Sequence, residues 1–95
     1  MKALPDNKYG IGEIVRATAG RDKGKLFIVM DIIDDNYVWI VNGKNRTIDR
    51  PKKKKIRHLK AAGASDYQIR EKILSGKKIF DSEISKILES FGYNE

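Results

Sequence analysis

The chain has 95 residues, with 20 Lys or Arg, 13 Asp or Glu, one His and no Cys, and its formal charge at pH 7 is +7. This length allows one small domain with a modest appendage. The absence of Cys excludes disulfide bonds, a thiol nucleophile and zinc sites built from Cys ligands, which leaves His58 as the single imidazole. We therefore expect a protein that is not an enzyme and that holds no metal ion or other cofactor.

Apolar residues make up 40% of the chain, which is enough for a thin core. Residues 1–6 lack the apolar stretch of a secretory signal, and no window of the sequence approaches the length of a membrane span. We therefore expect a soluble, cytoplasmic protein without membrane contact.

Residues 12–49 contain short β segments separated by turn signals. The composition predicts strands at Glu13–Ala19, Leu26–Ile33, Tyr37–Val41 and Asn45–Asp49. Turns are predicted at Gly20–Gly24, Asp34–Asn36 and the pair Asn42-Gly43, a strong hairpin signal. Because no helix separates these strands, they predict an antiparallel meander that curls into a small SH3-like barrel.

Alternation along these strands separates an inner face from an outer face. The side chains expected inside are Val15, Ala17, Phe27, Val29, Val38 and Ile40. The opposite face carries cations, including Arg16, Lys44 and Arg46. Tyr37 and Trp39 also lie outside in this assignment, where they either stack on unpaired bases or pack under C-terminal helices, and we favour packing.

The positive charge is concentrated in the first part of the chain. Residues 1–60 contain 15 basic and 7 acidic side chains, whereas residues 61–95 contain 5 basic and 6 acidic ones. The densest stretch, Arg50–Lys60, has seven basic residues in eleven and no acid, and Ile56 and Leu59 interrupt it. A run of this kind is often a solvated surface, but the two apolar residues suggest a basic tail anchored to the core. The asymmetry points to nucleic acid as partner, because cations that meet phosphates release condensed counterions.

After Gly63 the pattern changes to helix. The segment Ser65-Asp66-Tyr67-Gln68 predicts a capping box made by Ser65 and Gln68 ahead of a first helix, for which Gly76 is a suitable stop. A second helix is predicted from Asp81 or Ser82, with Gly92 after it and an apolar face made by Ile84, Ile87, Leu88 and Phe91. The predicted organisation is therefore a mainly β barrel with its basic tail at 1–60 and a C-terminal helical hairpin at 61–95. A DNA-reading helix-turn-helix is disfavoured, because the second helix opposes Lys86 with Glu83 and Glu89.

The segment Gly20-Arg21-Asp22-Lys23-Gly24-Lys25 carries the most specific signal of the chain. Two glycines four positions apart allow a tight loop with positive φ, and we expect exposed backbone amides surrounded by cations, an arrangement that suits phosphate. The spacing departs from the Walker pattern, so nucleotide binding is not expected. An ordinary barrel hairpin remains the alternative interpretation.

Together with Gly12-Glu13-Ile14-Val15 and the apolar strand that follows, this turn resembles the KOW motif over about residues 11 to 41. With the basic stretch, the resemblance extends to about residue 60 and is to small bacterial KOW-domain RNA-binding proteins. Those proteins are similar to KOW-type large-subunit ribosomal proteins of archaea and eukaryotes. Leu26 and Phe27 stand where many KOW motifs carry a further glycine. The resemblance implies an SH3-like barrel that binds RNA, above all ribosomal RNA, with ribosomal proteins as further partners.

The glycine turn, the outer face and the basic tail together give the candidate RNA-binding residues. They are Arg21, Lys23, Gly24, Lys25, Lys44, Arg46, Arg50, Lys52, Lys53, Lys54, Lys55, Arg57 and His58. No catalytic residue is expected, since no second imidazole or nucleophile arrangement accompanies His58, and no small-molecule substrate is expected either. Two other functions stay open: a DNA-binding small barrel, and a protein-interaction adaptor that acts through its C-terminal helices.

Overall fold

The computed structural model describes residues 10–93. Within this range the chain forms five strands, one short 3-10 helix and two α-helices: β1 (Glu13–Ala17), β2 (Leu26–Ile32), β3 (Tyr37–Val41), β4 (Lys52–Lys55), η1 (Ile56–His58), β5 (Leu59–Ser65), α1 (Tyr67–Leu74) and α2 (Asp81–Tyr93). None of the helices in these residues is long and apolar enough to cross a membrane.

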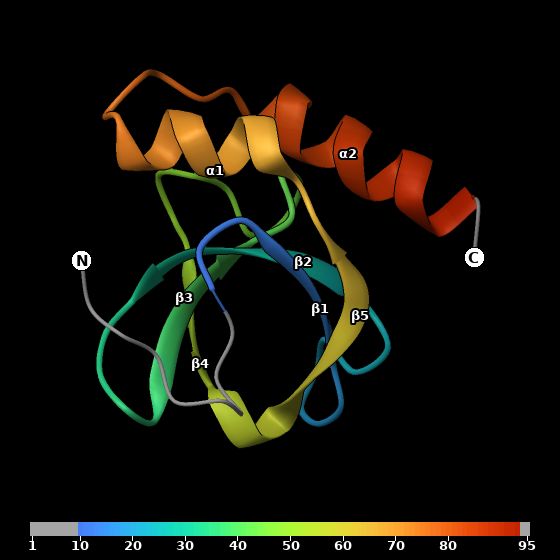
Figure 1. The fold of residues 1–95 in the computed structure, drawn as a ribbon. Coiled ribbons are helices and arrows are strands. Elements are labelled where there is room, and N and C mark those ends of the chain that lie inside the picture. The colour runs from blue at the N-terminus through green and yellow to red at the C-terminus, as the bar shows by residue number, and fades with distance from the viewer. Residues whose placement is uncertain (1–9, 94–95) are drawn as a thin grey trace.

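The strands form one antiparallel sheet in the order β4-β3-β2-β1-β5. The register shifts between Ile14 and Val15 in the β1–β5 pair and between Val29 and Asp31 in the β2–β3 pair. Irregularities of this kind increase the local bend and twist of a sheet. The sheet curls into a small barrel, with η1 joining β4 to β5 at one end and both helices covering the other (Figure 1). This arrangement confirms the predicted mainly β barrel followed by two helices.

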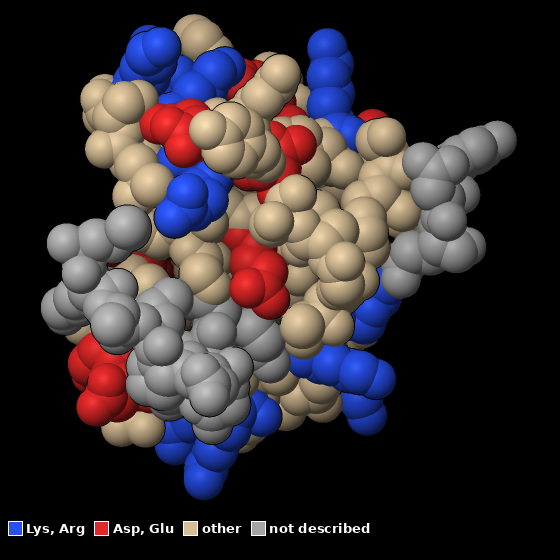
Figure 2. Space-filling model, in the orientation of Figure 1, with Lys and Arg blue, Asp and Glu red and all other residues tan. Residues whose placement is uncertain are grey.

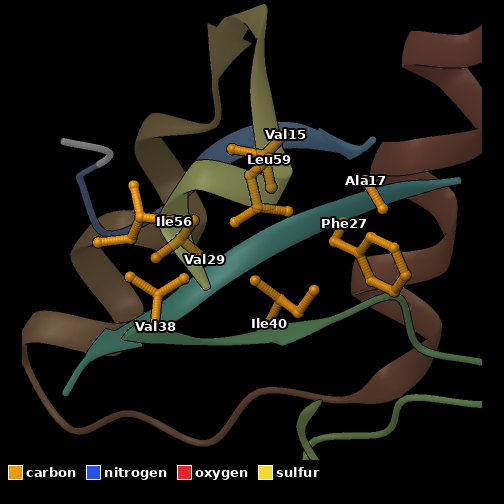
Figure 3. Close-up of a cluster of buried hydrophobic side chains, with 8 residues drawn as sticks. All are labelled: Val15, Ala17, Phe27, Val29, Val38, Ile40, Ile56 and Leu59. Atoms are coloured by element: carbon orange, nitrogen blue, oxygen red, sulfur yellow. The ribbon is translucent and has the colours of Figure 1, made fainter. Parts of the chain in front are cut away.

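The barrel interior contains the side chains that alternation predicted. All six expected inward residues lie in one buried cluster, together with Ile56 and Leu59. Figure 3 shows these side chains pointing toward one another from β1, β2, β3, η1 and β5. The two apolar residues of the basic stretch therefore do anchor it to the core.

A second apolar cluster lies on the other face of the sheet, under the helices. It joins Ile14, Ile28 and Val41 of the sheet to Ile69 of α1 and to side chains of α2. Strand β2 thus contributes to both clusters, with Phe27 and Val29 on one side and Ile28 on the other. This double burial explains why its sequence is almost uniformly apolar.

The predicted fourth strand at Asn45–Asp49 is wrong, because residues 42–49 form turns instead. The Asn42 carboxamide oxygen accepts hydrogen bonds from the backbone amides of Lys44 and Arg46, both at 3.0 Å. Asparagine side chains that bond nearby amides in this way compete with strand pairing. The fourth strand is the lysine run itself, which pairs with β3.

The basic stretch is therefore part of the barrel and not a tail that extends from it. After η1 it continues into β5, which pairs with β1 and runs across residue 60 as far as Ser65. Gly63 lies in β5 with φ of 87°, near the register shift. The division of the chain at residue 60 into two units stays a prediction.

An aspartate at the start of each helix accepts a hydrogen bond from a backbone amide. The cap of α1 is Asp66, whose Oδ1 accepts from the Ile69 amide at 2.8 Å, and not the predicted Ser65. In α2, Asp81 Oδ1 accepts from the amide of Ile48 at 2.8 Å, which fixes the helix to the turn that precedes β4. Gly92 lies inside α2, one residue before its end.

An ion pair joins the two helices into the predicted hairpin. Lys72 Nζ lies 2.6 Å from Glu83 Oε2. This hydrogen bond, together with one from the Phe80 amide to Glu83 Oε1, holds the pKa of Glu83 below its ordinary value.

Candidate nucleic-acid interface

The glycine turn between β1 and β2 has the predicted backbone but not the predicted free amides. Gly20 and Gly24 adopt φ of 87° and 89°. The amides of Lys23, Gly24 and Lys25 donate to the carbonyl oxygens of Gly20, Ala17 and Asp22 at 3.2, 2.8 and 2.9 Å. The expected exposure of these three amides is therefore wrong, and the turn presents its exposed side chains Arg21, Lys23 and Lys25 instead.

Asp22 is the internal anchor of this turn and is only 5% exposed. Its carboxylate accepts from Arg46 Nε at 3.1 Å and lies 3.0 Å from Arg46 Nη2. Asn45 Nδ2 donates to it at 3.4 Å, and Lys25 Nζ lies 3.6 Å away. Burial alone raises the pKa of Asp22, but these bonds and the charges of Arg46 and Lys25 outweigh it and leave the pKa lowered.

Strand β4 divides its four lysines between two faces. In the pairing with β3, Lys54 lies opposite Val38, which belongs to the barrel interior. Lys54 is accordingly buried, and its Nζ donates to the Ala19 carbonyl oxygen at 2.8 Å. Lys53 and Lys55 lie opposite Trp39 and Tyr37 on the outer face.

The outer face of β4 combines cations with an aromatic ring. Lys53 Nζ lies 4.6 Å from the centroid of the Tyr37 ring. Beside it, Tyr37, Lys55 and Arg57 line a cavity of about 230 Å³ together with Asn36 and Ile56. Among the described residues, neither Tyr37 nor Trp39 belongs to the apolar cluster under the helices, so the packing that we favoured for them is not observed.

Two hydrogen bonds connect the residues that precede the glycine turn to β4 and η1. The Thr18 amide donates to the His58 carbonyl oxygen at 2.9 Å, and Lys54 holds Ala19. The end of β1, β4 and η1 therefore meet at the end of the barrel away from the helices. In the view of Figure 2, Lys and Arg side chains project at that end of the molecule and again beside the helices.

The other candidate residues are spread more widely. Arg50 and Arg57 are exposed, whereas Lys52 and His58 are half-buried. Lys44 is exposed, and its Nζ lies 3.1 Å from Glu89 Oε1 of α2. Sequence reasoning missed Arg16 as a site residue, although alternation placed it outside; its Nη1 donates to the Gly24 carbonyl oxygen at 2.8 Å.

The titratable side chains of residues 10–93 form no metal-binding group. No set of three or more His, Cys, Asp or Glu residues in this range is arranged to hold a metal ion. The groups described above are cations, one aromatic ring and a neutralised carboxylate.

Comparison with known proteins relates the chain to one ribosomal family, although no protein-family model matches it. A large ribosomal subunit protein eL14 from Desulfurococcus amylolyticus is 39% identical over 67 residues, which cover 62% of this chain and 70% of the relative. The eL14 proteins of Pyrobaculum calidifontis and Staphylothermus marinus are each 32% identical over 85 residues. These alignments cover 90% and 80% of this chain and 76% and 88% of the relatives.

These relatives are archaeal ribosomal proteins, which agrees with the predicted similarity to large-subunit ribosomal proteins of archaea. The resemblance to small bacterial KOW-domain proteins stays a prediction. In the two longer alignments the similarity extends over most of the chain. The chain therefore belongs to the eL14 family of large ribosomal subunit proteins.

Proposed function

We propose that this chain is a non-catalytic RNA-binding component of the large ribosomal subunit that contacts ribosomal RNA. Membership of the eL14 family supports the ribosomal part of the proposal. The observation that carries the RNA-binding part is the outer face of β4 and η1, where Lys53, Lys55 and Arg57 stand beside Tyr37. Cations that meet phosphates release counterions, and an aromatic ring offers a stacking surface to an unpaired base.

The glycine turn supplies a second group of contacts in this proposal. Arg21, Lys23 and Lys25 project from it, and the one acidic residue of the turn, Asp22, is compensated within the protein. An RNA phosphate near the turn therefore meets little repulsion from that carboxylate. In this proposal two of the predicted contacts serve the protein itself, since Arg46 is bound to Asp22 and Lys54 to Ala19.

We further propose that the helices meet protein neighbours in the subunit. Tyr67, Leu74 and Phe80 are 71%, 47% and 53% exposed, although they are large apolar side chains. Exposed apolar side chains offer more contact to a protein neighbour than to a phosphate. This assignment gives the exposed apolar side chains near the helices a role that differs from that of the cations of the barrel.

The experiment that tests RNA binding compares two double variants of the full chain. Lys53→Ala/Lys55→Ala removes two cations from the outer face of β4. Lys77→Ala/Lys78→Ala removes two exposed cations from the connection between α1 and α2. The control is matched, since each pair includes one lysine over an aromatic ring: Lys78 Nζ lies 5.1 Å from the centroid of Phe80.

We expect the β4 variant to weaken binding to ribosomal RNA fragments. The slope of log K against log salt should become flatter by about 0.7 for each phosphate of single-stranded RNA that the variant no longer neutralises. Equal effects of the two variants would assign binding to net charge and contradict the proposed face. Stronger competition by duplex DNA than by duplex RNA would favour the DNA-binding alternative, and absence of the protein from large subunits on a sedimentation gradient would remove the ribosomal assignment.

A further inference from the structure

A groove separates the glycine turn from helix α2. It has a volume of about 540 Å³, and its walls come from the glycine turn, the turn at residues 42–45 and α2. We propose that this groove receives one unpaired nucleotide of the bound RNA, an inference that rests on the proposed function. Helix α2, to which the sequence assigned no RNA contact, then forms one wall of an RNA site.

The inner part of the groove suits a nucleobase. Leu26 of β2 and Leu88 of α2 give it an apolar floor, and Leu88 is 8% exposed. Arg16 lines the wall of the groove, and its guanidinium group is oriented by a 2.8 Å hydrogen bond to the Gly24 carbonyl oxygen. Unpaired bases stack on guanidinium planes as well as on aromatic rings, and such stacking uses the face of the group rather than its N–H donors.

The rim of the groove suits a phosphate. Lys25 and Lys44 both line it, with side chains that are 54% and 65% exposed. Gly24 also lines the groove and has no side chain, and the position of its absent Cβ has no atom within 4 Å other than those of its two chain neighbours. A backbone phosphate can therefore approach the turn closely at this point.

Glu89 places a carboxylate where that phosphate would lie. Its Oε1 is 3.1 Å from Lys44 Nζ, and both side chains are more than 60% exposed. An ion pair as exposed as this one is weak and is screened by salt. We infer that Lys44 exchanges Glu89 for an RNA phosphate, so that Glu89 lowers the affinity of the groove for RNA.

The volume of the groove bears on the type of ligand. Its volume lies within the range of about 300–1,000 Å³ that is usual for small-ligand sites. A paired base stays inside its helix, whereas a bulged nucleotide can turn out and enter such a space. The probe that follows is an RNA hairpin with one bulged nucleotide, compared with the same hairpin without the bulge.

The first test removes the cation at the rim. Lys44→Ala should abolish the preference of the protein for the bulged hairpin. Lys77→Ala removes an equal charge from an exposed site in the α1–α2 connection and should leave the preference intact. A Lys44→Ala variant that keeps the full preference would overturn the proposal.

The second test removes the competing carboxylate. Glu89→Gln should raise affinity for the bulged hairpin by about two- to fivefold, which is the effect expected from releasing an exposed ion pair. The matched control is Glu71→Gln, which changes an exposed carboxylate on α1 that lies 3.8 Å from Arg70 Nη1. When Lys44 is already replaced by Ala, Glu89→Gln should raise the affinity for the bulged hairpin no more than Glu71→Gln does.

The results separate this inference from the proposed function. If the wild-type chain binds neither hairpin, RNA binding itself is contradicted. If it binds both hairpins equally, or if Glu89→Gln gains no more than Glu71→Gln, RNA binding stands and the nucleotide groove is wrong. A bulge preference that depends on Lys44 and is increased by loss of Glu89 supports both.

Discussion

Lys54 Nζ donates a 2.8 Å hydrogen bond to the carbonyl oxygen of Ala19, a residue 35 positions earlier in the chain. This bond ties β4 to the start of the glycine turn. The adjacent Lys53 points to the outer face and lies over Tyr37. Neighbouring lysines of one strand therefore have different roles, one in the structure of the barrel and one on its surface.

This difference predicts that substitutions at two adjacent positions change the free energy of unfolding by different amounts. Lys54→Met keeps the buried aliphatic stem but leaves the Ala19 oxygen without its donor, which should cost about 1–3 kcal/mol in the free energy of unfolding. Lys53→Ala should change that free energy by less than about 1 kcal/mol, because its contact is exposed. Urea denaturation measures both values.

RNA titration of the same variants provides the complementary readout. Lys53→Ala should lower affinity, whereas folded Lys54→Met should bind with an affinity close to that of the wild type. If Lys54→Met were as stable as wild type and bound RNA poorly, Lys54 would be a surface contact and its assignment to the barrel would be wrong.

The Asp22 carboxylate predicts a specific loss of stability in acid. Its pKa is lowered in the folded state, so near the ordinary pKa of about 3.9 the unfolded chain binds more protons than the folded one. The stabilisation is therefore complete well above that pH, and it is lost as the pH falls through the folded-state pKa. Asp22→Asn should show a flatter decrease of stability between about pH 4 and pH 2 than wild type.

The Asp22 variant should also be less stable at neutral pH. Arg46 would lose its partner at a site where its side chain is 28% exposed, at a cost of about 1–3 kcal/mol. Asp49→Asn, which changes an exposed carboxylate, is the control for net charge. Melting temperatures measured across this pH range test the assignment, and parallel curves for wild type and Asp22→Asn would refute it.

Two glycines with similar φ predict different costs of an added methyl group. Gly43 has φ of 77°, and a Cβ there would collide with the carbonyl oxygen of Asp81 at the start of α2. Gly24 has φ of 89° but open space around it. Gly24→Ala should cost only the backbone strain, about 1–2 kcal/mol, whereas Gly43→Ala should cost more and loosen α2.

Thermal unfolding distinguishes the two glycine variants. For a domain of this size, each kcal/mol lowers the melting temperature by about 4–8 °C. Equal shifts for Gly24→Ala and Gly43→Ala would show that α2 does not press on the turn at residues 42–45. An unchanged melting temperature for Gly24→Ala would contradict the left-handed backbone at that position.

The inner face of the barrel could be predicted because alternation is a local property. Val15 and Ala17, two positions apart, must lie on one face of a strand. The lysine run gave no such signal, since four identical residues show no alternation. That β4 lies there, and that Lys54 rather than Lys53 is buried, depends on its register against β3.

The charged residues of the candidate site could also be predicted from the sequence. The residues that they bind within the protein could not. Arg46 and Lys54 reach Asp22 and Ala19 across 24 and 35 positions of sequence, and nothing local marks these pairs. The error at Asn45–Asp49 has a different cause, because the pair Asn42-Gly43 is a hairpin signal in most sequences. Here the Asn42 side chain bonds the two amides that a following strand would have used.

The N-cap of α1 can also be tested, because the sequence predicts Ser65 as the capping residue and the structure has Asp66. Asp66 Oδ1 accepts the Ile69 amide at 2.8 Å, and Ile69 itself is 2% exposed in the cluster under the helices. Asp66→Ala should therefore cost about 0.5–2 kcal/mol, whereas exposed Ser65 should be replaceable by Ala at less than about 0.5 kcal/mol. Urea denaturation measures both variants, and a Ser65→Ala cost equal to that of Asp66→Ala would restore the capping box predicted from the sequence.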